Sequence, residues 1–379
     1  MLHAITLLGL LVAGLQGLGL AQDLNSRALA DLEWGGARSA AASRALHDQA
    51  AALTKETAAA LRAELEVTPG DLVARMTLMC YEEPENRRRR SAKASPVPHG
   101  ELLLGLIEQH PRSRVAASAG LMLYPYKRDG MYSGPAWEQG LELWERLVRE
   151  HPKDPAIASN AGLFGIADPF RMVTDGPRAL ELLQRARELA PKEPRWAINL
   201  GAYYLQARYG SRDPELRKAV ATRGFLHLRA GWDLTQPELR SELSLHGRPL
   251  TKALASVAFD AGEGESAEAF ARQTLESEGV AQPRGDVVFE MNTILGRLAF
   301  AADDKDAAVR YLLAAGQTSG SPSLGSFGPD MQLARELLGA GEREAVLEYL
   351  KSCKGFWKMG QDRLADWILK IESGKDPWQ

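Results

Sequence analysis

The chain is poor in cysteine and has no excess charge of either sign. Its 379 residues include two cysteines, Cys80 and Cys353, and 46 basic residues against 49 acidic ones. So few cysteines exclude a small domain held together by disulfides. Two separate buried thiols are favoured over a disulfide, because the two cysteines lie far apart in sequence, and the repeat array that the prolines described below indicate would place them near its opposite ends. The net charge of −3 gives no electrostatic attraction for nucleic acid, so none is predicted as a partner.

Sequence motifs of enzymes and cofactor-binding proteins are also missing. The chain has no HExxH helix, no GxSxG elbow, no GxxxxGK[ST] loop and no GxGxxG at the start of a helix. Its histidines are not paired with cysteines at zinc spacing, and the acidic run at 303–306 is too short for a calcium loop. The sequence therefore predicts no catalytic residue, no metal and no cofactor.

Strand patterns are almost absent, and helical spacing takes their place. In 71–82, Leu72, Met76 and Met79 fall on one helical face, and Asp71 precedes the helix as a side-chain cap. Other helix starts pair an acidic residue with proline, which suits the first helical position. These pairs are Asp154-Pro155, Glu193-Pro194 and Asp213-Pro214. The sequence predicts an all-α chain with essentially no β-sheet.

A helix-ending phrase recurs with a proline at Pro111, Pro152 and Pro191. The spacing of about 40 residues is typical of a helical repeat array. Small and apolar residues recur at fixed positions of these units. They are Ala179, Leu183 and Ala186 in one unit, Leu254, Ala255, Gly262, Ala267 and Leu275 in another, and Leu295, Gly296, Ala308, Leu312 and Ala315 in the next. Through these residues the units resemble tetratricopeptide repeats (TPRs), antiparallel helix pairs of about 34 residues in which small residues let the helices pack closely.

The resemblance implies a right-handed α-solenoid of antiparallel helix pairs. The chain is also similar to exported bacterial TPR proteins of unassigned role, through 71–82 and 105–113. The expected organisation is a signal peptide at 1–21 and one TPR-like domain at 22–379, divided into N-terminal helices at 22–81, an Arg/Pro-rich loop at 82–98, repeats at 99–355 and a C-terminal capping helix with tail at 356–379.

Residues 4–21 form an uncharged apolar run that ends in Gly19-Leu20-Ala21. Small residues at this place are typical of signal-peptide cleavage, so we expect an exported protein cut near Ala21. The alternative is an N-terminal membrane anchor, because the run is nearly long enough to span a bilayer and no Lys or Arg precedes it. A membrane is expected as a partner only if this segment stays attached.

In the TPR family, the first helices of successive units line a concave groove that holds extended peptides. Asn160 and Asn199 occupy the same repeat position, and Arg195 is close to the second. Two amides and a guanidinium facing a groove could bind a peptide backbone. The alternative is that each asparagine bonds a neighbouring loop carbonyl and fixes the superhelix.

Two loops inserted within the units, at 124–139 and 165–178, bring aromatic and basic residues together. Tyr126 and Arg171 are the peptide-binding candidates among them, because interaction surfaces are enriched in such side chains. The alternative is that loop aromatics cover the joints between helices. Trp137, Trp144 and Trp196 are predicted to lie in the core.

The function we expect is a non-catalytic scaffold that binds a protein or peptide through the concave groove, in the cell envelope or outside the cell. One alternative is a cell-wall glycan-processing enzyme on a helical toroid or superhelix, with paired carboxylates in a deep pocket. Another is a purely structural assembly subunit. An open groove with exposed Asn160, Asn199 and Arg195 would favour the binding scaffold.

Overall fold

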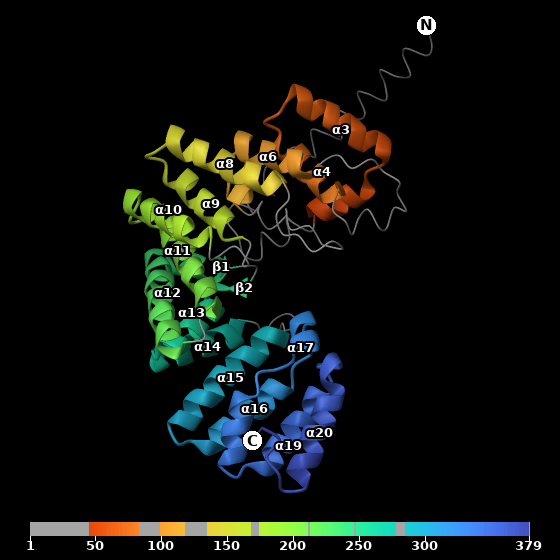
Figure 1. Ribbon diagram of the computed structural model, residues 1–379, viewed down its shortest axis with the longest axis vertical. Helices are drawn as coiled ribbons and strands as arrows, with labels where there is room; N and C mark the ends of the chain where they lie inside the picture. Colours follow the sequence, from red (N-terminus) through yellow and green to blue (C-terminus); the bar gives the residue numbers. More distant parts are fainter. Residues whose placement is uncertain are drawn as a thin grey trace. The chain divides into compact units, whose positions relative to one another are not determined.

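The computed structural model describes residues 45–82, 99–117, 135–167, 174–210, 213–245, 248–277 and 285–378, and these residues are mostly helical (Figure 1). The chain divides into two compact units. Unit 1 is Met1–Gln206 with Ala230–Gly247, and unit 2 is Ala207–Arg229 with Arg248–Gln379.

Unit 1 consists of helices in which each packs on the next along the chain. They are α3 (Lys55–Val67), α4 (Leu72–Glu82), α6 (His99–Gln109), α8 (Pro135–Glu150), α9 (Pro155–Gly165), α10 (Gly176–Leu189) and α11 (Pro194–Ala207), followed by the 3₁₀ turn η3 (Pro237–Glu242) and β1 (Ser244–Leu245). Contacts join α3 to α4, α4 to α6, α6 to α8 and α8 to α9, and the most extensive join α9 to α10. This order is that of stacked helix pairs.

Unit 2 is also built from helix pairs. It contains η2 (Arg208–Gly210), the first part of α12 (Pro214–Leu234), β2 (Arg248–Pro249), α13 (Leu250–Ala261), α14 (Gly264–Ser277), α15 (Gly285–Ala301), α16 (Lys305–Gly316), α17 (Pro322–Phe327), α18 (Gln332–Gly339), α19 (Arg343–Cys353), η4 (Lys358–Gly360) and α20 (Gln361–Glu372). Within the described ranges, the strands are two pieces of two residues. The all-α prediction is confirmed.

Glycines on α9 and at the predicted signature position Gly296 of α15 allow neighbouring helices to approach closely. A side chain at Gly162 of α9 would have its Cβ 2.8 Å from Leu183 of α10. At Gly296 of α15, the Cβ would lie 2.4 Å from Leu333 of α18. Gly262 ends α13 with φ 84°, a left-handed conformation that favours glycine. A larger side chain would therefore overlap its neighbours at Gly162 and Gly296, and it would strain the backbone at Gly262.

The predicted helix starts are confirmed. Asp154 accepts hydrogen bonds from the amides of Ala156 and Ile157 at the start of α9. Asp213 accepts one from the amide of Glu215 at 2.9 Å, and α12 begins at the intervening proline. A carboxylate at this place satisfies amides that have no partner within the helix.

Ion pairs join helices of successive repeats in unit 2. Lys252 of α13 pairs with Glu290 of α15. Arg297 of α15 pairs in turn with Glu336 of α18 at 3.4 Å. The partners are 38 and 39 residues apart in sequence, so each bond spans one repeat.

The tryptophans and cysteines are placed as predicted. Trp137, Trp144 and Trp196 are buried, and the ring of Trp137 stacks on Phe164 with centroids 4.6 Å apart. Cys80 and Cys353 are both buried thiols. The expected signal peptide and all of the Arg/Pro-rich loop beyond Glu82 lie outside the described residues. Among the described helices, none has the length and apolar character to cross a bilayer.

Candidate functional site

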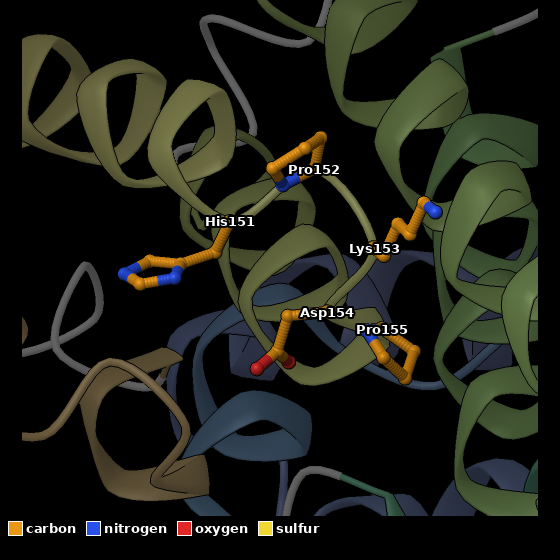
Figure 2. Close-up of a pocket in the computed structure, with 5 residues that line it drawn as sticks. All are labelled: His151, Pro152, Lys153, Asp154 and Pro155. Atoms are coloured by element: carbon orange, nitrogen blue, oxygen red, sulfur yellow. The ribbon is translucent and has the colours of Figure 1, made fainter.

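The turn between α8 and α9 carries one of the repeat-ending prolines and borders an open hollow of about 410 Å³ (Figure 2). The side chains of His151 and Lys153 leave this turn in opposite directions. Asp154 caps α9 and pairs with Arg112 at 2.6 Å. Burial opposes the ionisation of Asp154, but the hydrogen bonds from Arg112 and the helix amides outweigh it and lower the pKa of this carboxyl. The carboxylate therefore has a structural role.

The two predicted asparagines are buried. Asn160 is 0% exposed, and its Nδ2 donates to the carbonyl oxygens of Pro111 and Ser113, each at 2.9 Å. Asn199 is 4% exposed, and its Nδ2 donates to Ser159 Oγ at 2.9 Å. The expectation that both are exposed is wrong, because the close approach of successive repeats leaves buried acceptors that require donors. For Asn160 the contacts are those of the structural alternative.

Arg195 is half-buried beside this network. Its Nη2 lies 3.4 Å from Asn160 Oδ1, and its Cζ lies 4.8 Å from the ring centroid of Trp196. An arginine that stacks on an indole keeps a defined direction. The three predicted groove residues on α9 and α11 thus come together, with Arg195 as the most accessible of them.

A second cavity of about 400 Å³ lies against α11 in unit 1, and we name it the α11 cavity. Its lining has three kinds of side chain. Apolar ones are Pro194, Ile198, Leu234, Leu239 and Leu243, charged ones are Arg114, Glu193 and Arg195, and neutral polar ones are Asn199, Thr235, Gln236 and Ser244. Two guanidiniums and one carboxylate leave the cavity with a positive surplus.

Residues 234–244, at the end of α12 and in η3, supply another part of the lining, which we call the η3 wall. Local contacts hold this wall in place. Gly231 packs so closely on α11 that its Cβ would lie 2.5 Å from Ile198. Thr235 Oγ1 donates to the Gly231 carbonyl at 2.8 Å. Arg240 Nε donates to the carbonyls of Trp232 and Thr235, at 3.1 and 3.2 Å. The η3 wall is therefore held in place before any ligand arrives.

Each of the two hollows has one carboxylate in its lining. Asp154 is the single carboxylate at one, and Glu193 is the single carboxylate at the other. Neither hollow supplies the carboxylate pair that glycoside hydrolysis uses. The described part of the chain also contains no group of three His, Cys, Asp or Glu residues placed to hold a metal ion.

Two of the predicted peptide-binding residues lie outside the described residues, and one part of the cavity lining was not predicted from the sequence. Tyr126 and Arg171 lie in segments that are not described. The wall at 234–244 was missed, because 207–247 keeps helical character but loses the repeat signature. The available signal was the break Thr235-Gln236-Pro237 directly after a long helix, where a chain must turn.

No family model and no curated protein matches the chain. Among solved structures, it is similar to TTC0263, a TPR protein of Thermus thermophilus, at 19% identity, with 62% of this chain and 99% of that one covered and a TM-score of 0.32. It is also similar to human IFIT1 dimers, with PPP-AAAA at 15% identity and with m7Gppp-AAAA at 13%. The IFIT1 matches cover 84% of this chain and 67% and 68% of theirs, each with a TM-score of 0.41. The stacked helix pairs themselves define a TPR-like helical repeat protein.

Proposed function

We propose that the protein is a non-catalytic scaffold that binds a protein or peptide segment in the α11 cavity. The observation that carries the proposal is a cavity of about 400 Å³ whose lining combines apolar side chains, including Leu239 and Leu243, with two guanidiniums. Ligand pockets typically enclose about 300–1,000 Å³ and combine apolar lining with a few polar groups. The α11 cavity has this composition and size.

Each part of the cavity has a role in the proposed complex. An apolar side chain of the ligand fills the space beside Ile198 and Leu239, and its burial supplies most of the affinity. Arg114 and Arg195 carry only donors, so they select backbone carbonyl or carboxylate oxygens next to that side chain. Asn160 acts indirectly, because its amide lies next to the Arg195 guanidinium.

The setting that we propose follows from the apolar segment at 4–21. Export with cleavage near Ala21 would place the scaffold in the cell envelope or outside the cell. The ligand would then be a segment of another envelope or extracellular protein.

Peptide selection tests the proposed binding. The full chain is immobilised, displayed peptides of random sequence are selected on it, and the affinity of those recovered is measured by fluorescence anisotropy. Leu239→Glu places a carboxylate in the apolar part of the cavity, and we expect it to weaken binding by about tenfold or more. Arg195→Ala should also weaken binding, through the loss of a donor.

Leu226→Glu is the matched control, because Leu226 is an exposed leucine on α12 that does not line the cavity. Circular dichroism and urea unfolding confirm that each variant is folded. Recovery of no peptide above background, or equal affinity for all three variants, would rule out binding in the α11 cavity.

A further inference from the structure

Two large apolar side chains of unit 2 project from neighbouring elements. Phe327, at the end of α17, is 88% exposed, and Met359, in η4, is 78% exposed. The two elements are in contact. We call these two residues, with the exposed surface of 321–328 and 354–363 around them, the Phe327–Met359 patch. At this exposure, neither side chain is enclosed by the part of the chain that the structure describes.

The patch is built on the indole of Trp357. Gly328 follows Phe327, and Gly360 follows Met359. A Cβ at Gly328 would lie 2.4 Å from Trp357 Cε2, and one at Gly360 would lie 2.1 Å from the same atom. Both glycines therefore pack directly on this buried ring. The backbone under each exposed side chain is held by the same contact, which keeps the two side chains projecting outward.

The charge around the patch is positive, in contrast to the chain as a whole. Residues 317–329 contain no charged side chain. Residues 354–363 contain three exposed basic side chains, of Lys354, Lys358 and Arg363, against one exposed carboxylate, of Asp362. The Arg363 guanidinium lies 5.7 Å from the Trp357 ring centroid, so it belongs to the same platform. The surplus of two positive charges (3 − 1) stands within a chain of net charge −3.

The next acidic residue after 363 is Asp366, which is exposed and pairs with Lys370 at 2.8 Å. The next acidic residue after 317–329 is Asp330, which is also exposed. Its Oδ1 accepts a hydrogen bond from the amide of Gln332 at 2.7 Å, at the start of α18. This carboxylate is therefore directed toward its own helix. It reduces the positive surplus of the patch without reversing it.

We propose that the Phe327–Met359 patch binds the surface of an anionic lipid bilayer. Phe327 and Met359 enter the region between headgroups and acyl chains, and the basic side chains remain at the level of the headgroups. A bilayer accommodates projecting side chains of any outline, whereas a protein partner would need two matching pockets. Basic residues near an anionic leaflet add attraction that decreases with salt.

The contact is expected to be weak and reversible, because two apolar side chains and a small positive surplus give limited membrane affinity. It uses no residue of the α11 cavity. The proposal is therefore independent of the proposed peptide binding, and either can fail without the other.

The test places an environment-sensitive fluorophore at the patch of the full chain. Phe327→Cys and Met359→Cys are each labelled with a nitrobenzoxadiazole reagent, which the buried Cys80 and Cys353 thiols resist. Each labelled protein is mixed with vesicles of phosphatidylcholine, alone or with 40 mol% phosphatidylserine. We expect a blue shift and higher emission with the anionic vesicles, both of which decrease in 0.5 M salt.

Leu226→Cys is the matched control, since it carries the same label at an exposed leucine of unit 2 outside the patch. Any attachment through residues 4–21 affects all labelled proteins alike, so only a local contact distinguishes them. In the Phe327→Cys background, Lys354→Glu with Lys358→Glu should raise the lipid concentration at half-saturation by about tenfold or more.

Three results would overturn membrane binding by the patch. They are an unchanged emission at positions 327 and 359, an equal change at position 226, and the same half-saturation after charge reversal. The first of these results, unchanged emission with every vesicle, would favour a protein partner with pockets for the two side chains.

Discussion

The position of Gly328 makes two demands that only glycine, among the amino acids, can meet together. Its φ is 86°, and a Cβ there would lie 2.4 Å from the Trp357 ring. Gly328→Ala therefore combines an unfavourable backbone conformation with an overlap against a buried indole. We expect it to lower the free energy of unfolding by about 2–4 kcal/mol, measured by urea denaturation.

Gly341→Ala separates the two costs. Gly341 has φ 95°, and no atom lies within 4 Å of the place its Cβ would take. Only the backbone cost applies there, about 1–2 kcal/mol. Losses of equal size for both variants would contradict the close packing of Gly328 on Trp357.

The buried thiol of Cys353 should make the free energy of unfolding decrease at alkaline pH. Burial raises the pKa of its thiol to about 12, from an ordinary 9.0, although a hydrogen bond with Tyr349 opposes part of the rise. Burial also raises the pKa of Tyr349. Between about pH 9 and 12 the unfolded chain therefore binds fewer protons than the folded one, and stability is lost as pH rises through this range. We expect the urea midpoint to fall steadily above pH 9.

Cys353→Ala removes one of the two groups and should make the alkaline fall less steep. Cys80→Ala, at a buried cysteine of unit 1, controls for the loss of a thiol elsewhere. An identical slope for the native chain and Cys353→Ala would show that this thiol does not contribute.

At the scale of elements, η2 and α12 both bond to α13 through one carboxylate. Arg208 Nη1 of η2 lies 3.2 Å from Asp260 Oδ2, and Arg217 Nη2 of α12 lies 3.2 Å from the same oxygen. Arg208 is 2% exposed and also donates to Ser256 Oγ at 2.8 Å, whereas Arg217 is 47% exposed. The same carboxylate thus forms one ion pair with a buried arginine and one with an exposed arginine, so the contributions of the two pairs to stability can be compared directly.

Arg208→Ala should be far more costly than Arg217→Ala. Removing the buried guanidinium leaves Asp260 without its buried ion-pair partner and Ser256 without its donor, and it opens a cavity. The expected cost is about 3–5 kcal/mol. The exposed pair is worth about 1 kcal/mol or less because water and salt screen it. Urea denaturation in low and high salt measures both. Similar losses for the two variants would refute the dependence on burial.

Elements defined by nearby residues were predictable. The helix start at Asp154-Pro155 depends on contacts within four residues, and the turn at Gly262 depends on one dihedral angle. A helix was expected within 356–379, and α20 lies there with apolar residues that recur at helical spacing. Such features are encoded locally, so a single sequence reveals them.

The candidate site was less predictable, because distant contacts decide it. Asn160 is buried because its amide reaches carbonyls 47 and 49 residues earlier in the chain. Helical spacing places a residue on a face, but it does not say which carbonyls will need a donor there. The α11 cavity joins Arg114 to residues near 195 and 239, and no local pattern relates these three segments.

At the scale of the molecule, side-chain hydrogen bonds link each repeat to the one before it. Asn160 binds the turn of the repeat before it, Asn199 binds Ser159, and Arg185 donates to the Pro152 carbonyl at 2.6 Å. Stability in such an array is approximately the sum of each repeat and its contacts with its neighbours. Damage to one link should therefore remain local.

Asn160→Asp tests how far such damage spreads. The variant keeps the size of the side chain but replaces two donors to the Pro111 and Ser113 carbonyls with a buried carboxylate. In hydrogen–deuterium exchange read by mass spectrometry, we expect faster exchange in 104–117 and in α9, and unchanged exchange in α19 and α20. Asn292→Asp is the matched control, because Asn292 is buried but its amide donates to Val288 of its own helix at 2.8 Å. Its effect should centre on α15. If Asn160→Asp instead accelerated exchange uniformly through both units, the repeats would unfold as one cooperative body and the nearest-neighbour description would be wrong.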